Sequence, residues 1–337
     1  MPAILDLVFS DLFVSTTRER SFYKTAPDSR QVVSLPAWCE NEFSDLRRVL
    51  LKNIQWPSFR HEWVSGEHRE RLRVTPFKTA EGEPLLICRR ALLQRESHVL
   101  SLSDLGFPAA VVRRLLEVPL RQGLLLIMGS KGAGKTTARA AFLRDYITKH
   151  GGVCMALDAP IEIDLDGPCG GGHILQQEIS SELEMGAALR GTLRSSSDII
   201  SPGEVTRDEV AAEVLDLATS GQLVPTTFHA EDLISGLARF NRNSGSRNDA
   251  FADGLSAAVH LSLSTEPSKQ HKAVGRSEEF SFPGEIAPPQ RLLSVTPLFI
   301  VRENQDHVRS HIRGGQFHQL TSEIDRQRRL MLAGGLP

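Results

Sequence analysis

The residues best suited to chemistry lie in one stretch that fits the pattern G-x-x-x-x-G-K-[ST] in full. Its glycines let the backbone curl so that several N–H groups point at phosphate oxygens. In this arrangement Lys135 reaches the β- and γ-phosphates of a nucleotide, and the hydroxyl of Thr136 holds magnesium. The candidate phosphate-binding residues are Gly129, Ser130, Lys131, Gly132, Ala133, Gly134, Lys135, Thr136 and Thr137.

The segments on either side give this stretch the context that it needs. Residues 124–128 are a short apolar run, typical of a buried parallel strand, and residues 137–150 have helical spacing before Gly151. A strand before the loop and a helix after it favour nucleotide binding over the alternative, a glycine-rich turn with a surface lysine. The predicted inner face of the helix comprises Ala138, Ala141, Phe142 and Tyr146.

The composition limits the classes of protein to which this chain can belong. A chain of 337 residues with 40% hydrophobic content predicts two domains with real cores, and the formal net charge of −2 argues against a dominant nucleic-acid-binding surface. The four cysteines lack C-x-x-C spacing, which predicts free thiols in a reducing cytosol. The N-terminus lacks a signal-peptide pattern, and no apolar run approaches the roughly 20 residues that span a bilayer. We therefore expect any membrane association to be peripheral.

Residues 1–100 are predicted to form a small α+β domain. Residues 41–51 have helical spacing, residues 71–75 alternate like a strand, and residues 85–88 form the returning strand of a hairpin. The hairpin carries several arginines, which without further context are explained by a solvated strand face. These arginines are Arg71, Arg73, Arg89 and Arg90.

The second domain follows a linker. Residues 101–122 are that linker, with a turn at 103–108 and an amphipathic segment at 111–120. From residue 123 to 337, short apolar strands alternate with helices, which predicts an α/β fold with a mostly parallel sheet. Such sheets place catalysis where acidic groups follow strand ends beside a phosphate loop. The other expected strands are 153–157, 198–200 and 223–228, and the other expected helices are 182–193 and 209–219.

The C-terminal part is less regular. Residues 264–290 are rich in Ser, Pro, Gly and charge, and we interpret them as a long mobile loop between strands at 257–263 and 292–301. Residues 322–332 are predicted to be a helix whose arginines face solvent. These arginines are Arg326, Arg328 and Arg329.

Taken together, segments along nearly the whole chain resemble the secretion ATPase superfamily that powers type IV pili and type II and type IV secretion. Residues 10–15 resemble its opening strand, and residues 105–108 resemble the start of its motor domain. Residues 312–320 resemble a segment that favours the pilus-retraction (PilT-like) and conjugation or type IV secretion branch. The resemblance implies a RecA-like P-loop motor domain, preceded by a PAS-like α+β domain.

Two carboxylates match motifs of this superfamily. Its acidic box is matched by Asp158, Pro160, Ile161 and Glu162, with Ala159 where an acidic residue is usual. Glu162 is implied to orient or deprotonate the attacking water. The alternative for Glu162 is an exposed glutamate in a loop.

The second carboxylate ends the Walker B segment, residues 199–204. Glu204 is implied to support the magnesium ion together with Thr136. Pro202 departs from the motif because proline cannot donate a hydrogen bond to a strand ladder. Thr206 stands where the superfamily usually has arginine, with Arg207 one place later.

The remaining candidates come from the resemblance as well. His229 ends a strand of the histidine box and is implied to sense the γ-phosphate, although Gln222 replaces the first histidine and a structural role is the alternative. Arg194 is implied to pair with an acidic-box carboxylate. Arg73 and Arg89 match positions implied to reach the nucleotide site of a neighbouring subunit, where they neutralise charge on the transferring phosphoryl group.

The function that follows is that of a cytoplasmic ATPase, using ATP and Mg²⁺, that works as a hexameric ring. The resemblance places it peripherally at the cytoplasmic face of the inner membrane, with platform or secretion-channel proteins as partners and no direct nucleic-acid contact. Two alternatives stay open at this point. One is a weakly or non-hydrolysing structural paralogue in the same ring assembly, which Ala159, Pro202, Thr206 and Gln222 favour. The other is a RecA-like nucleic-acid motor, against which the low basic charge counts.

Overall fold

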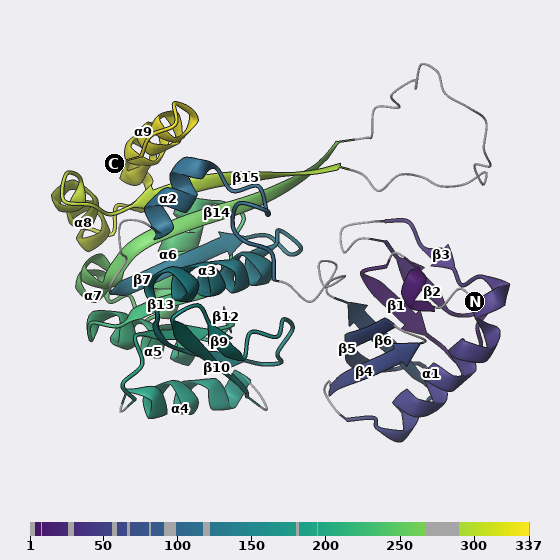
Figure 1. Ribbon diagram of the computed structural model, residues 1–337. Coiled ribbons are helices and arrows are strands. Elements are labelled where there is room, and N and C mark those ends of the chain that lie inside the picture. The colour runs from purple at the N-terminus through teal and green to yellow at the C-terminus, as the bar shows by residue number, and fades with distance from the viewer. Residues whose placement is uncertain are drawn as a thin grey trace, which may run out of the picture.

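The chain folds into two lobes, an N-terminal one and a larger one that carries the phosphate loop (Figure 1). The computed structural model describes residues 4–7, 9–25, 30–55, 59–65, 68–80, 82–90, 99–116, 122–179, 182–193, 195–266 and 290–336.

The N-terminal lobe is built on a six-stranded sheet in which all neighbouring strands are antiparallel, in the order β3-β2-β1-β6-β5-β4. The predicted hairpin is confirmed, because β5 pairs with β6. Short 3₁₀ helices occupy Ile4–Asp6 and Ala37–Cys39. The strands are β1 (Asp11–Val14), β2 (Phe22–Lys24), β3 (Val33–Ser34), β4 (Phe59–Ser65), β5 (His68–Lys78) and β6 (Pro84–Arg90).

One helix, α1 (Glu40–Lys52), packs on this sheet and confirms the helical spacing of residues 41–51. Its buried side chains Phe43, Leu46 and Leu50 recur at intervals of three and four residues, so they share one face of the helix and enter the core of the lobe. Acidic residues in the first turn and Lys52 in the last complement the helix dipole.

Burial corrects the prediction of a solvated arginine face at one position. Arg90 is buried, and its guanidinium donates to Oε1 of Glu70 and to the carbonyls of Leu5 and Leu7. It also lies 5.0 Å from the ring centroid of Phe9. Arg90 therefore ties the first residues of the lobe to its sheet, and alternation along β6 puts Arg89 on the opposite face.

The second lobe contains a sheet in the order β15-β14-β7-β13-β11-β8-β10-β9, with β12 paired to β13. The central pairs are parallel, and the two edge pairs, β14–β15 and β9–β10, are antiparallel, which confirms a mostly parallel sheet. The strands are β7 (Gly123–Gly129), β8 (Gly152–Asp158), β9 (Gly167–Cys169), β10 (Gly172–Glu178), β11 (Ile199–Pro202), β12 (Glu204–Val205), β13 (Leu223–His229), β14 (Leu255–Glu266) and β15 (Gln290–Phe299).

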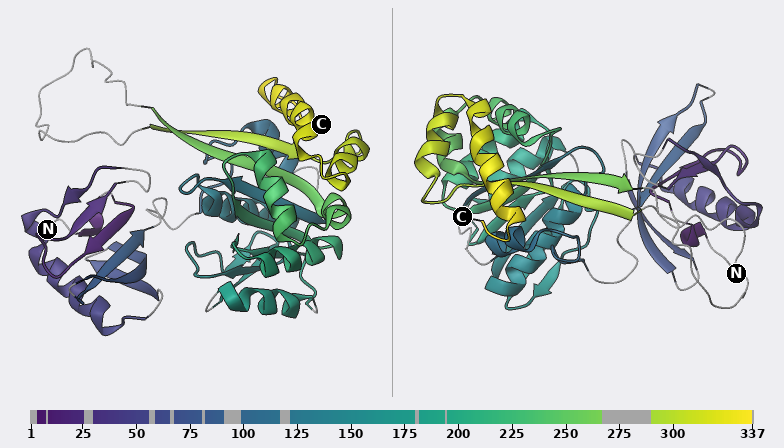
Figure 2. Two further views of the ribbon diagram at one scale, coloured as in Figure 1. Left: turned by 180° about the vertical axis from the view of Figure 1, so that it is seen from behind. Right: turned by 90° about the horizontal axis from the view of Figure 1, so that it is seen from above.

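Helices cover both faces of this sheet (Figure 2). Successive residues of β7 alternate between two buried clusters, with Leu124 and Leu126 in one and Leu125 and Ile127 in the other. The first cluster includes side chains from α4 to α8, and the second includes side chains from α2 and α3. The helices are α2 (Ala109–Leu116), α3 (Lys135–His150), α4 (Glu182–Thr192), α5 (Asp208–Thr219), α6 (Leu233–Asn243), α7 (Asn248–Gly254), α8 (Gln305–Arg313) and α9 (Thr321–Leu332), with a 3₁₀ helix at Phe317–Leu320.

Several boundaries differ from the expected ones. The predicted strand and helix around the phosphate loop are confirmed, but α3 begins at Lys135 rather than 137. The amphipathic segment forms α2 two residues earlier than expected, at Ala109, and residues 117–121 lie outside the described residues. The expected loop at 264–290 is wrong at both ends, since β14 continues to Glu266 and β15 begins at Gln290, while residues 267–289 lie outside the described residues.

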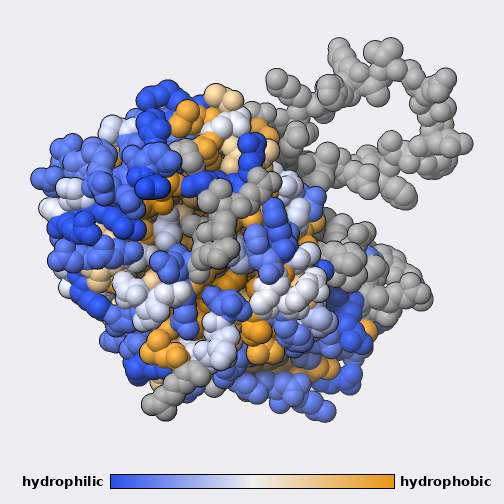
Figure 3. Space-filling view, turned by 60° about the vertical axis from the view of Figure 1, so that its left-hand side comes forward, coloured by the Kyte–Doolittle hydropathy of each residue, from blue (hydrophilic) through white to orange (hydrophobic). Residues whose placement is uncertain are grey.

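The molecular surface is mixed. On the face shown in Figure 3, hydrophilic residues predominate and hydrophobic ones occur in scattered groups.

All four cysteines are free, as expected, and burial raises the pKa of Cys154 to about 12. Across the ranges that the structure describes, no helix is both long and apolar enough to cross a bilayer.

Candidate functional site

The phosphate loop joins β7 to α3 and takes the form that the sequence predicts. Gly129 has no room for a side chain, because a Cβ atom there would lie 2.6 Å from the carbonyl oxygen of Leu261 and 2.9 Å from Cβ of Ala133. Gly134 has a φ of +86°, in the left-handed region, and is the residue from which α3 starts. The glycines thus let the backbone turn directly into the N-terminus of α3, where unpaired N–H groups favour an anion.

Lys135 is the first residue of α3, and its side chain is folded into this loop. The residue is only 9% exposed, and Nζ donates to the carbonyl oxygen of Ser130 at 3.2 Å. The same Nζ lies 3.8 Å from Oε1 of Glu204. Burial lowers the pKa of Lys135, while the carboxylates of Glu204 and Glu162 oppose the shift. The lysine therefore lies among acidic groups that a polyphosphate can replace as its partner.

Strand register explains why these residues meet. In the parallel pairs, His229 lies opposite Gly129 and Glu204 lies opposite Thr227, so the carboxyl ends of β7, β12 and β13 reach the same edge of the sheet. On the other side, Pro202 of β11 lies opposite Leu157 of β8. Residues that follow these strands therefore converge on the loop before α3, which is where open α/β sheets bind ligands.

Glu162 lies beside an arginine of the N-terminal lobe. Nη1 of Arg73 is 3.6 Å from Oε1 of Glu162, and each side chain is about one-third exposed. The distance joins two residues of the same chain, so Arg73 already reaches the site of its own subunit. The expectation that Arg73 reaches the nucleotide site of a neighbouring subunit stays a prediction.

Arg89 is engaged within the N-terminal lobe. Its Nε and Nη2 atoms each lie 2.8 Å from Oδ1 of Asp11, and Asp11 is buried. The two residues are directly opposite each other in the β1–β6 register. The structure therefore brings Arg73, and not Arg89, to Glu162.

The last two candidates differ in outcome. His229 ends β13 as expected, next to the loop, and its Nε2 lies 3.6 Å from a carboxylate oxygen of Glu231. Arg194 lies outside the described residues, so its pairing stays a prediction.

A magnesium ion fits this donor set as a partner of the nucleotide. Within the described residues, no group of three or more His, Cys, Asp or Glu side chains is arranged to hold a metal. Mg²⁺ needs few protein ligands because it keeps several waters and binds phosphate oxygens. The half-exposed carboxylate of Glu204 and the first-turn hydroxyl of Thr136 are the groups that can contact the ion or its waters.

Comparison with known proteins shows the family. The family model described as type II/IV secretion system protein matches residues 61–279, which is more than half of the chain. The chain belongs to this family. The match spans the end of the N-terminal lobe, the phosphate loop and both carboxylate motifs.

Curated members of the secretion family are about one-third identical to this chain over the aligned residues. The type IV pilus assembly ATPase PilB of Acinetobacter baylyi is 30% identical over 229 residues, which are 65% of this chain and 37% of PilB. The protein transport protein HofB homologue of Haemophilus influenzae is 33% identical over 177 residues, which are 50% of this chain and 35% of that protein. The chain thus corresponds to little more than a third of the length of these relatives.

Solved structures show that the fold extends over the whole chain. The ATPase DotB of Legionella pneumophila has a TM-score of 0.69 with 17% identity, covering 97% of this chain and 89% of DotB. The pilus retraction motor PilT, solved with bound ADP, has a TM-score of 0.68 with 20% identity, covering 99% of this chain and 92% of PilT. The secretion-family fold is therefore present in both lobes.

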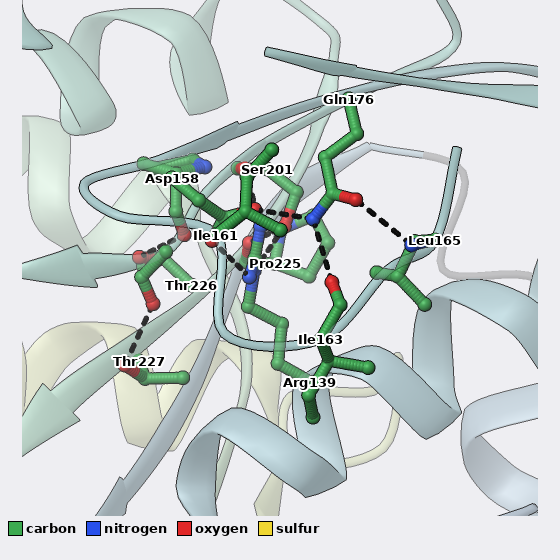
Figure 4. A network of polar contacts seen from close by, with 12 residues as sticks. Arg139, Asp158, Ile161, Ile163, Leu165, Gln176, Ser201, Pro225, Thr226 and Thr227 are labelled. Carbon is green, nitrogen blue, oxygen red and sulfur yellow. Dashed lines mark hydrogen bonds and ion pairs between the residues drawn. The ribbon is translucent and has the colours of Figure 1, made fainter. Parts of the chain in front are cut away.

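Sequence reasoning missed one polar cluster of this secretion-family site, which we call the Arg139 network (Figure 4). Arg139 lies one turn after Lys135 on α3 and is 1% exposed. Its guanidinium donates to Oδ1 of Asp158 and to both oxygens of Ser201, each at 2.8 Å. Gln176 donates to the other carboxylate oxygen of Asp158 at 2.8 Å. The one signal in the sequence was a charged residue among alanines in the helix after the loop.

Proposed function

We propose that this chain is a Mg²⁺-dependent ATPase that couples ATP hydrolysis to type IV pilus dynamics or to type IV secretion or conjugation. The observation that carries the proposal is the approach of Lys135, in a complete phosphate loop, to Glu204 at 3.8 Å. This approach joins a phosphate-binding cation to a carboxylate suited to the metal shell. Membership of the type II/IV secretion family supports the process that hydrolysis serves.

Each residue of the site has a separate role in the proposed reaction. Lys135 and the amides before α3 bind the phosphates, and Thr136 and Glu204 hold Mg²⁺ and its waters. When bound, the ion supplies positive charge that offsets the charge on the β- and γ-phosphates. Glu162 orients the attacking water and accepts its proton.

Two further side chains complete the charge balance. Arg73, beside Glu162, contributes positive charge at the site of its own chain, at the 3.6 Å separation described above. His229, opposite Gly129 in the register, senses the γ-phosphate from the end of β13.

The assembly proposed is a hexameric ring at the cytoplasmic face of the inner membrane. A ring follows from a head-to-tail interface that closes on itself, and Arg89 is the residue through which one subunit completes the site of the next. Membrane association is peripheral, and inner-membrane platform or secretion-channel proteins receive the force. We also propose that the N-terminal lobe is a PAS-like domain.

The test is phosphate release by the purified chain, measured with ATP in the presence and absence of Mg²⁺ over a range of protein concentrations. The proposal expects Mg²⁺-dependent release whose specific rate rises with protein concentration, and a light-scattering mass that approaches six chains when nucleotide is added. A chain that binds ATP but releases no phosphate at any concentration contradicts the assignment as an ATPase.

A non-hydrolysing ring component is the second candidate, and the Walker B segment favours it. Proline at position 202 ends β11 one residue before Gly203, and the strand resumes only as the two-residue β12. If this interruption moves Glu204 away from the metal, the chain binds nucleotide without turnover. The same phosphate-release assay separates the two candidates, because both expect nucleotide binding and only the first expects release.

A further inference from the structure

The neighbouring strands β11 and β13 of the second lobe each contain a proline, Pro202 and Pro225, in the stretch where the two strands lie side by side. β11 pairs with β13 at Ile199 and Leu223, and pairing resumes at Glu204 opposite Thr227. Between these points Pro202 and Pro225 have no N–H to donate to a ladder. Residues 199–202 still pair with β8, but on the side of β13 the backbone that leads to Glu204 depends on other donors.

Side-chain hydroxyls replace the missing ladder. Ser201 Oγ donates to the carbonyl oxygen of Pro225 at 2.6 Å, and Thr226 Oγ1 donates to that of Pro202 at 3.0 Å. Thr227 Oγ1 donates to the carbonyl oxygen of Gly203 at 2.7 Å. All three hydroxyl-bearing residues are buried, so water does not offer alternative partners.

Arg139 joins this hydroxyl-bridged seam to the phosphate-loop helix. Its Nη2 donates to the carbonyl oxygen of Ser201 and its Nε to Ser201 Oγ, which in turn donates to Pro225. Its Nη1 donates to Asp158 at the end of β8. One buried guanidinium thus connects the four segments that carry Lys135, Glu162, Glu204 and His229.

Asp158, which Arg139 binds, contacts Gly203, the residue before Glu204. A Cβ atom at Gly203 would lie 2.5 Å from Oδ1 of Asp158, so the carboxylate packs directly against the Gly203 backbone. The amide of Gly203 also donates to the carbonyl oxygen of Leu157 at 2.8 Å. Arg139 fixes Asp158, whose carboxylate packs against Gly203, and Thr227 of β13 donates to the carbonyl oxygen of Gly203.

We propose that Arg139 is a positioning residue, which keeps Glu204 in register with Lys135 where the two prolines interrupt the main-chain ladder between β11 and β13. The inference rests on the proposed function for its catalytic consequence. It assigns no contact with nucleotide to Arg139, because the residue is fully buried behind the loop. The expected consequence is that loss of Arg139 lowers turnover roughly 10- to 100-fold, the usual effect of a supporting residue, and leaves nucleotide affinity unchanged.

The test must separate positioning from simple stabilisation. Removing one partner of a buried ion pair destabilises a protein strongly, whereas replacing both partners by apolar residues is often neutral. We therefore compare Arg139→Met with the double variant Arg139→Met/Asp158→Leu, and use Arg144→Met as the control on the same helix. For each protein we measure the melting temperature, the affinity for a non-hydrolysable ATP analogue, phosphate release, and amide hydrogen exchange of residues 199–205.

If Arg139 positions Glu204, the melting temperature of the double variant should be close to that of the parent, although that of Arg139→Met is lower. The turnover of the double variant should nevertheless stay low. Positioning by Arg139 also predicts roughly tenfold faster exchange at residues 203–205 in both Arg139 variants, since the hydrogen bonds from Arg139 to Ser201 and Asp158, which support this segment, are gone. Arg144→Met should match the parent in all four measurements.

The proposal is overturned if exchange at residues 203–205 in the double variant equals that of the parent, or if turnover returns together with stability. The exchange measurement needs no nucleotide, so it decides on Arg139 even for a chain without ATPase activity. A parent that neither binds nor hydrolyses ATP would instead contradict the proposed function.

Discussion

Nζ of Lys135 lies 3.8 Å from Oε1 of Glu204, although 68 residues of chain that include four other strands of the sheet separate them. The two side chains meet because β7 and β12 each pair in parallel with β13, and parallel strands bring their carboxyl ends to one edge. With no phosphate between them, the cation and the carboxylate face each other. When a nucleotide binds, its phosphates are expected to replace Glu204 as the partner of Lys135. Glu204 is then expected to contact the metal and its waters.

Glu162 is expected to act on turnover and not on binding. Glu162→Gln keeps the size of the side chain but removes the base, so phosphate release should fall by about 10²- to 10⁴-fold, the range for general-base catalysis. Affinity for a non-hydrolysable ATP analogue should remain at the parental value. Glu184→Gln, which changes an exposed carboxylate on α4, is the matched control, and a Glu162→Gln protein with the activity of that control contradicts the assignment.

Arg89 is expected to complete the site of a neighbouring subunit. Arg89→Ala should reduce turnover on the order of 10³-fold, as loss of an arginine finger does in other nucleotidases. Mixing it with Lys135→Ala subunits should recover part of the activity, because some interfaces then hold one intact loop and one intact arginine. The measurement is phosphate release as a function of mixing ratio.

The buried partner of Arg89 requires a control for this prediction. Asp11 accepts a hydrogen bond from Nε of Arg89, forms an ion pair with its Nη2, and loses this compensating charge in Arg89→Ala. Asp11→Asn alone should keep turnover, and Asp11→Asn/Arg89→Ala should behave like Arg89→Ala and be complemented in the same way. Dead variants that co-assemble without regaining activity would show that the site is not shared between subunits.

Thr226 is expected to contribute to stability through the hydroxyl-bridged seam. Thr226→Val keeps the shape of the side chain but leaves the buried carbonyl of Pro202 without its donor, which should cost about 1–3 kcal/mol in urea unfolding. Thr219→Val is the control, because its hydroxyl contacts carbonyls within its own helix. Equal stability of the two variants would mean that the seam does not need this bond.

Glu323 is expected to make stability depend on pH in the acid range. Burial alone would raise its pKa, but hydrogen bonds from Arg326, Gln327 and Asn304 outweigh burial and lower the pKa to about 2 from 4.5. The folded state therefore binds the proton less well than the unfolded state. The stabilisation is complete above pH 4.5 and is lost as pH falls toward 2.

Urea unfolding at several pH values tests this expectation. Glu323→Gln should be less stable than the parent at pH 7 and should show a smaller loss of stability between pH 4.5 and 2. Asp325→Asn, an exposed carboxylate on the same helix, should follow the parental curve. Identical curves for Glu323→Gln and the parent would contradict the role of this carboxylate.

The elements around the phosphate loop could be predicted because local patterns determine them. The apolar run of β7, the complete loop motif and the glycine after α3 each carry a signal within a few residues. The strand β9 was missed because it is a three-residue Gly-Pro-Cys segment, and β10 was missed because it ends in the polar residues Gln176, Gln177 and Glu178. The pairing of these strands at the edge of the sheet is a tertiary event.

The interior of the site could not be predicted for a different reason. Helical spacing assigns one inner face to α3, but this helix packs on two sides and buries Arg139 as well. Its partners Asp158 and Ser201 lie 19 and 62 residues further along the chain, so no local pattern indicates the network. The same holds for Pro202, whose missing hydrogen bond is offset by hydroxyls of β13.

The most direct test of the central claim compares nucleotide affinity and phosphate release in Lys135→Ala and Glu204→Gln. The account predicts that Lys135→Ala loses both, because it removes the cation that binds the phosphates. It predicts that Glu204→Gln retains affinity for a non-hydrolysable ATP analogue and loses most phosphate release, because it alters the metal shell alone. Lys135→Ala with parental turnover, or Glu204→Gln with parental turnover, would contradict the claim that these two side chains form one ATPase site.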